Sequence, residues 1–247
     1  MLTHSLSFLP SLQQRPPFLS PADSGMLLTY FRLTGVAVTE KRYYNSDALE
    51  AESRVISCTP QGDDRFCVIL SATLFHPQGG GQPSDKGTIN GVNMLQAVQD
   101  GDEVIHITDG ALETGPAHLT VDAELRALHS RYHSAGHLIG LAGEKYGWLG
   151  IKGNHKPGEG RIVFEPTGTL LPVTVDDLAA EVAALVQRGD KRAISEAAGK
   201  RLVTWGDLKP YACGGTHVLN TAEIGTIRII KVKEKKGQLS VQYELDR

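Results

Sequence analysis

Apolar and polar positions divide the chain into a strand-rich first half and a second half that mixes helices and strands. From Met26 to about Ala117, short apolar runs are separated by turn residues. The clearest runs lie at 54–59, 66–71 and 104–107. Turns rich in Gly, Asn and Asp lie at 60–64, 79–81, 90–91, 100–101 and 109–110. Short strands at this spacing predict a small barrel or sandwich.

A helical pattern begins near Thr120. Between Asp122 and about Tyr146 there is no proline, and apolar residues recur every three or four positions. Asp122 is a suitable N-cap for this predicted helix. A second helix is predicted over 175–187, with acids in its first turn where the helix dipole favours negative charge. A short third helix is predicted over 191–198.

Strands return after these helices. Apolar runs predict strands over 161–165, 225–232 and 239–245, and a turn at 235–238 joins the last two as a hairpin. The second half is therefore predicted to pack helices on a mostly antiparallel sheet. The fold class is α+β, with a small N-terminal β-barrel followed by this second domain. We place the divisions at 1–25, 26–118 and 119–247.

Composition is that of a soluble globular protein. Hydrophobic residues make up 40% and charged residues 21% of the 247 positions. No run of about 18 apolar residues is present, so we expect no membrane partner. Because the net charge is -3 at pH 7, any contact with RNA requires a local basic patch rather than a basic protein.

The first 25 residues read as a tail, because they are rich in Pro and Ser and lack a periodic apolar face. Their single acid, Asp23, gives a weaker indication of organelle targeting. The chain has three cysteines, an odd number that indicates a reducing compartment. We therefore expect a cytoplasmic protein, with organelle targeting as the alternative.

Two short motifs carry candidate metal ligands. His133 and His137 are four residues apart in the predicted helix, so both imidazoles share one face. Cys213 and His217 flank Gly-Gly-Thr, whose glycines allow a tight turn. One cysteine and three histidines suit Zn²⁺. Ser134 stands where His-Glu-x-x-His metalloproteases carry their general base, so that chemistry is disfavoured.

These four side chains leave two metal arrangements open. Together they fill a tetrahedral shell; if one is displaced, a water takes its place and the ion can activate it. His129 extends the same helix face and is predicted beside the site or on the surface rather than as a ligand. His106 and His118 are expected to be ordinary strand or loop residues.

A glycine-rich segment at 75–87 offers contacts for a ligand. Its three consecutive glycines are Gly79, Gly80 and Gly81. Glycines let the backbone approach a ligand closely, and their N–H groups can bind an anion or a carbonyl. Gln82 could orient an amine or a hydroxyl, and a flexible turn is the plain alternative. The segment lacks the Gly-Lys-Ser/Thr of a Walker loop, so we expect no ATP use.

A second glycine-rich loop, at 152–161, is locally basic. Its basic and imidazole side chains are Lys152, His155, Lys156 and Arg161. Such a loop could contact phosphates, and a solvated loop is an equal alternative.

Together these motifs resemble the editing domain of alanyl-tRNA synthetase, and most closely the free-standing AlaX-type proteins. The resemblance covers roughly 39–246. It rests on the pair His133 and His137, on Cys213-Gly-Gly-Thr-His217 and on the Gly79-Gly-Gly-Gln82 loop. The Cys-Gly-Gly-Thr-His motif is specific, whereas the editing domain of threonyl-tRNA synthetase shares only its metal spacing.

The resemblance implies a hydrolase that deacylates Ser-tRNA(Ala), and often Gly-tRNA(Ala), in trans. It implies a barrel whose glycine-rich loop closes over a zinc cleft, with Gln82 near the substrate. We expect a catalytic or selective role for Gln82 and for Thr73, which could bind the serine hydroxyl. The implied zinc ligands are His133, His137, Cys213 and His217. The predicted substrate-binding residues are Gly79, Gly80, Gly81, Lys152, His155 and Arg161.

In the expected reaction water attacks the aminoacyl ester, and N–H groups of the glycine loop stabilise the oxyanion. Two alternatives stay open: a metal-dependent hydrolase of a small ester or amide, and a non-catalytic RNA-binding module with structural zinc. The sequence does not fix the oligomeric state.

Overall fold

The structure, a computed structural model, describes residues 38–246. The predicted tail at 1–25 and the strand-like run that opens at Met26 lie outside the described residues. Within 38–246, no helix is both long and apolar enough to cross a membrane.

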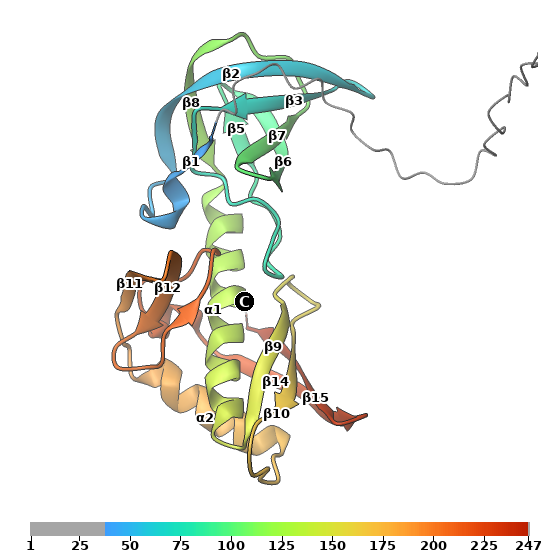
Figure 1. The fold of residues 1–247 in the computed structure, drawn as a ribbon, viewed down its shortest axis with the longest axis vertical. Helices are drawn as coiled ribbons and strands as arrows, with labels where there is room; N and C mark the ends of the chain where they lie inside the picture. Colours follow the sequence, from blue (N-terminus) through green and yellow to red (C-terminus); the bar gives the residue numbers. More distant parts are fainter. Residues whose placement is uncertain (1–37, 247) are drawn as a thin grey trace, which may run out of the picture. The chain divides into compact units, whose positions relative to one another are not determined.

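Six strands of the first half pair into one sheet that closes on itself (Figure 1). Their order is β2-β3-β7-β6-β5-β8, and β8 pairs antiparallel with β2 to close the barrel. The strands are β2 (Glu50–Gly62), β3 (Arg65–Leu70), β5 (Gly87–Ile89), β6 (Val92–Asp100), β7 (Glu103–Thr108) and β8 (Gly115–Val121). Alternate side chains point inward and form one core. Its members include Val55, Leu70, Ile89, Met94, Val104 and Leu119.

Turn residues set where the strands of the barrel end. Asn90 and Gly91, between β5 and β6, both adopt positive φ, as a type I′ hairpin turn requires. The turn expected at 60–64 is shorter than predicted, because β2 continues through Pro60 and the chain reverses at Asp63 and Asp64. Three short elements complete this half: β1 (Glu40–Lys41), the 3-10 helix η1 (Arg42–Tyr44) and β4 (Ala72–Thr73), which pairs with β1 in parallel.

The long helix α1 (Ala123–Glu144) follows the barrel and has the predicted N-cap. The Asp122 carboxylate accepts a hydrogen bond from the Leu125 N–H at 2.9 Å, which satisfies a helix donor that has no intrahelical partner. The second predicted helix is α2 (Val175–Gln187), where Thr174 and Asp177 form a capping box.

Both helices pack on a four-stranded antiparallel sheet of order β14-β15-β10-β9. Its strands are β9 (Trp148–Asn154), β10 (Arg161–Pro166), β14 (Ile227–Lys235) and β15 (Gln238–Leu245). Phe164 and Val241 from the sheet share a second core with Leu138 of α1 and Leu178 of α2. The predicted α+β class, with helices on a mostly antiparallel sheet, is thus confirmed, and so is the hairpin at 235–238.

The helix predicted over 191–198 is wrong. These residues form β11 (Arg192–Ala197), which pairs with β12 (Lys200–Trp205) through a turn at Ala198 and Gly199. Alanine and glutamate favour a helix here, but pairing with β12 satisfies the backbone across the sheet and outweighs local propensity. β13 (Tyr211–Ala212) adds a third strand, and the 3-10 helix η2 (Thr221–Ile224) follows.

Candidate metal centre

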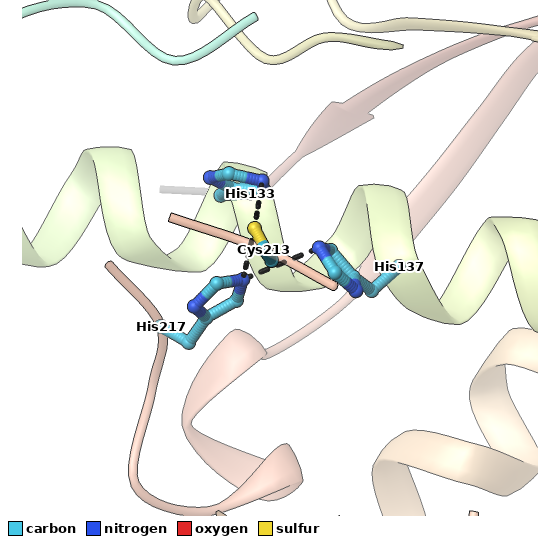
Figure 2. Close-up of side chains that lie close together, drawn as sticks. All are labelled: His133, His137, Cys213 and His217. Carbon is cyan, nitrogen blue, oxygen red and sulfur yellow. Dashed lines mark hydrogen bonds between the residues drawn. The ribbon is translucent and has the colours of Figure 1, made fainter. Parts of the chain in front are cut away.

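The two predicted metal motifs meet in the structure. His133 and His137 lie one turn apart on α1, and Cys213 and His217 lie in the loop after β13, about 80 residues later. One ligand atom from each side chain lies within 4.8 Å of all the others. Figure 2 shows the four side chains pointing toward one another. His133 and His217 are buried, and His137 and Cys213 are half-buried.

Three separations between these donor atoms fit a tetrahedral zinc ion, and all separations among the four atoms are within 4.8 Å. Zn–N bonds of about 2.0–2.1 Å and a Zn–S bond of about 2.3 Å require N···N separations of about 3.3–3.4 Å and N···S separations of about 3.5–3.6 Å. The Nε2 atoms of His137 and His217 are 3.3 Å apart. The Cys213 Sγ lies 3.4 Å from His133 Nε2 and 3.6 Å from His217 Nε2. The donor set therefore fits zinc in both chemistry and spacing.

The protonation of the three imidazoles favours a cation. Burial lowers the pKa of His137 to about 3. Burial, reinforced by neighbouring imidazoles, lowers the pKa of His133 and His217 well below the usual value of 6.5. Neutral imidazoles have a free lone pair, which a metal can accept. Burial raises the pKa of the Cys213 thiol, although the Gly215 N–H at 3.4 Å opposes this shift.

The side chain of Gln82 holds both halves of the centre together. It is 1% exposed, and its Oε1 accepts from His133 Nδ1 at 2.6 Å and from the Thr216 N–H at 3.0 Å. Its Nε2 donates to Thr216 Oγ1 at 2.8 Å. Because Nδ1 of His133 carries the donated proton, its Nε2 lone pair faces the other three donors.

Arg201 fixes the loop that carries Cys213, and sequence reasoning did not predict it. Its Nη1 donates to the carbonyl oxygens of Cys213 and Gly215 at 2.8 and 3.1 Å. Its Nε donates to the Tyr44 carbonyl at 2.8 Å. The role arises from the pairing of β12 with β13, which brings Arg201 beside this loop and which no local pattern encodes.

A cavity of about 430 Å³ opens beside the four donors. Three of the candidate ligands line it, namely His133, His137 and Cys213. The predicted substrate-binding residues that line it are Gly79, Gly80, Lys152 and His155. Its walls include the glycine-rich loop, α1, the edge strand β9 and the loop after β13. Lys152 of β9 belongs to the predicted basic loop, whereas Gly150 and Ile151 of the same strand were not predicted to line a site.

The glycine-rich loop reaches the cavity as a tight turn. Gly79 and Gln82 exchange two backbone hydrogen bonds, and Gly80 and Gly81 between them adopt φ of +58° and +81°. The Gly81 carbonyl accepts from the His155 N–H at 2.8 Å. A Cβ at Gly81 would lie 2.2 Å from the Gly153 carbonyl oxygen, so only glycine permits this approach.

His155 is the fourth imidazole of the site. Its ring stacks on that of His133, with centroids 4.3 Å apart and an interplanar angle of 18°. Its Nδ1 lies 2.8 Å from the Tyr243 hydroxyl, which itself donates to the Tyr132 carbonyl. The hydroxyl must therefore accept from Nδ1, which leaves Nε2 as an acceptor. Burial lowers the pKa of His155 to about 4.

Five of the predicted residues do not line this cavity. Gly81, Gln82 and His217 lie just behind its wall through the contacts described above, whereas Thr73 and Arg161 have other surroundings. Thr73 is fully buried, and its Oγ1 lies 2.8 Å from His106 Nε2 and accepts from the Phe75 N–H at 3.0 Å. Arg161 is exposed on β10. Contacts of either residue with a substrate stay predictions.

Comparison with known proteins agrees with this geometry. Residues 201–240 match the family described as "Threonyl and Alanyl tRNA synthetase second additional domain". The chain is 32% identical to Alanyl-tRNA editing protein Aarsd1 of Danio rerio over 219 residues, which cover 76% of this chain and 53% of that protein. It is 29% identical to Alanyl-tRNA editing protein AlaX-L of Pyrococcus horikoshii, over 82% of this chain and 56% of that protein.

The chain is thus similar in sequence to the alanyl-tRNA editing proteins over most of its length. The resemblance predicted from the two metal motifs and the glycine-rich loop is confirmed. The chain spans about half the length of the curated editing relatives it matches. It is also 29% identical to Alanine--tRNA ligase of Cenarchaeum symbiosum, of which it covers 25%.

Proposed function

We propose that this protein is a zinc-dependent deacylase that removes serine, and also glycine, from mischarged tRNA(Ala). The observation that carries the proposal is the convergence of one thiol and three imidazoles beside a cavity of about 430 Å³, with three of these four side chains on its wall. The similarity to proteins named for alanyl-tRNA editing supplies the substrate class.

His133, His137, Cys213 and His217 would hold the ion. When bound, zinc supplies Lewis acidity toward the ester carbonyl or toward an attacking water. The N–H groups of Gly80 and Gly81 have no hydrogen-bond acceptor within 38–246, and Gly80 lines the cavity. These two N–H groups are therefore the backbone donors we assign to the oxyanion that forms during hydrolysis.

His155 is assigned to substrate orientation. With Nδ1 donated to Tyr243, its Nε2 can accept a hydrogen bond from the substrate's ammonium group or a ribose hydroxyl. The His155 N–H donates a hydrogen bond to the Gly81 carbonyl, so the positions of the oxyanion donors and of the His155 ring are fixed relative to each other. Recognition of serine by Thr73 would require its hydrogen bond with His106 to open.

The proposal is tested with purified protein, by metal analysis and by deacylation of Ser-, Gly- and Ala-tRNA(Ala). We expect one zinc ion per chain. We expect Ser-tRNA(Ala) to be hydrolysed at least about tenfold faster than Ala-tRNA(Ala), because a synthetase pocket separates these amino acids by only about 1–3 kcal/mol and editing must add to it.

The variant His137→Ala should lose zinc and activity together, whereas His118→Ala, an exposed residue of β8, serves as the control. Activity on a minimal seryl ester but none on charged tRNA would instead indicate a small-ester hydrolase. Bound zinc without hydrolysis of either substrate would indicate a structural metal and refute the proposal.

A further inference from the structure

The four-stranded sheet has one face that the helices do not cover. Buried side chains of β10 and β15, such as Phe164 and Val241, pack toward α1 and α2. Side chains at the alternate positions of these strands point the other way, and Arg161, Glu165 and Gln242 among them are exposed. Within 38–246, α1 and α2 are the elements outside the sheet that make extensive contacts with its strands, which can be followed in Figure 1.

Strand register gathers basic side chains on this open face. Val163 of β10 lies opposite Lys152 on one side and Ser240 on the other, and Ser240 lies opposite Lys233. The adjoining row runs through Asn154, Arg161, Gln242 and Lys231. Lys235 pairs with Gln238 in the next row. We call Lys152, Arg161, Lys231, Lys233 and Lys235 the basic face.

The charge of the basic face is not neutralised by its neighbours. All five side chains are exposed, and none forms an ion pair within 38–246. Two nearby acids, Glu159 and Glu244, pair instead with Lys156 and Arg228. Glu165 is the one acidic residue of β10 on this face, and it accepts a hydrogen bond from Gln238. In a chain of net charge -3, such a concentration of positive charge marks a local site for a polyanion.

We infer that the basic face binds the phosphate backbone of the tRNA. This inference rests on the proposed deacylation of mischarged tRNA. Lysines at alternate positions of β14 stand about 6.6–6.8 Å apart, so they present a row of charges rather than a pocket for one anion. Base-paired RNA is contacted mainly through its backbone and 2′-hydroxyls, which suits such a row. β9 is both the edge strand of this sheet and a wall of the cavity, where Lys152 belongs to both. RNA on this face would therefore end beside the candidate metal centre.

The test compares two double variants with the same change of charge. Lys231→Gln/Lys233→Gln removes two charges from the basic face, and Lys191→Gln/Lys200→Gln removes two exposed lysines at the β11–β12 sheet. Binding of uncharged tRNA(Ala) is measured at several salt concentrations. For the first variant we expect affinity about tenfold weaker near 0.15 M salt, with the slope of log K against log salt reduced by about 0.7–0.9 per lost contact.

The Lys191→Gln/Lys200→Gln variant should bind within about twofold of the parent protein, and Lys231→Arg/Lys233→Arg should keep affinity because the charge is retained. Equal losses in both double variants, or no loss in the first, overturn the inference. The inference is also overturned if Lys231→Gln/Lys233→Gln binds tRNA normally but loses binding to phosphatidylserine vesicles. That result would assign the basic face to a membrane surface. Failure of the parent protein to deacylate Ser-tRNA(Ala) refutes the proposed function alone, because binding of uncharged tRNA is scored separately.

Discussion

Among single residues, Gln82 has the most connected role, because one amide orients His133 and anchors the backbone beside His217. Partners that orient a metal-binding histidine commonly contribute about 10–100-fold to metal affinity. We expect Gln82→Ala to weaken zinc binding by that factor, measured by competition with a chromophoric chelator. Gln96→Ala, which removes an exposed amide on β6, is the control. Equal affinity in both variants would show that Gln82 does not position the centre.

His106 makes stability depend on pH. Burial lowers its pKa to about 4, against 6.5 in an unfolded chain. The unfolded state therefore binds the proton more tightly, so the stabilisation is complete above pH ~6.5 and is lost as pH falls toward 4. The loss from this residue approaches about 3 kcal/mol. Urea unfolding of the parent protein and of His106→Gln at pH 7, 5.5 and 4 should show a steeper decline for the parent. Parallel declines would contradict this.

Residue spacing predicted the metal motifs but not what surrounds them. Two histidines four apart on a helix, and a cysteine and a histidine around two glycines, can be recognised from one sequence. Arg201 and Tyr243 cannot be recognised in this way, because each reaches the site only through strand pairing, of β12 with β13 and of β10 with β15.

At the scale of elements, α1 contains three glycines, and the surroundings of two of them, Gly136 and Gly140, differ. A Cβ at Gly136 would lie 2.3 Å from the His155 ring, whereas at Gly140 the nearest atom is the Tyr211 hydroxyl at 3.7 Å. Gly140→Ala should therefore raise the free energy of unfolding by up to about 1 kcal/mol, the usual gain in helix propensity. Gly136→Ala should lower it by about 1–3 kcal/mol, because overpacking outweighs that gain.

Urea unfolding of both variants measures this contrast on one helix. A similar gain in both would show that the His155 ring can move away from α1 at little cost. The Gly136→Ala variant should also bind substrate less well, since the same ring lines the cavity.

Elements with strong local signals could be predicted from the sequence, and those that depend on a partner could not. α1 has an N-cap and a long amphipathic pattern, and α2 has acids in its first turn; both helices end within two residues of the predicted limits. The segment at 192–197 has helix-forming residues, but β12 makes it a strand. β9 was missed because Gly150 and Gly153 interrupt the alternation of apolar and polar residues by which a strand is recognised.

At the scale of the whole described molecule, the site depends on contact between the glycine-rich loop and the second half. Gly81 lies against Gly153, and Gln82 bonds to α1 and to the loop after β13. The motifs indicated which segments would meet. Their association depends on close glycine contacts and on buried polar groups that leave no periodic pattern in the sequence.

A buried ion pair holds these halves together. Asp85, at the end of the glycine-rich loop, is fully buried and bonds to Arg126 of α1. Asp85 also accepts from the His76 N–H at 2.6 Å, and Arg126 donates to the Leu74 carbonyl at 2.6 Å. Removing one partner of such a pair leaves an uncompensated charge and costs about 3–5 kcal/mol. Asp85→Leu and Arg126→Met should each destabilise the protein by this amount in urea unfolding.

The double variant Asp85→Leu/Arg126→Met should be less destabilised than the sum of the single variants, since replacing both charges leaves no unpaired ion. The exposed pair Lys156 and Glu159 provides the control cycle, with an expected coupling below about 1 kcal/mol. Additive effects at the buried pair would mean that Asp85 acts only through the His76 backbone. In that case the loop, rather than the ion pair, would position Gln82 over the candidate metal centre.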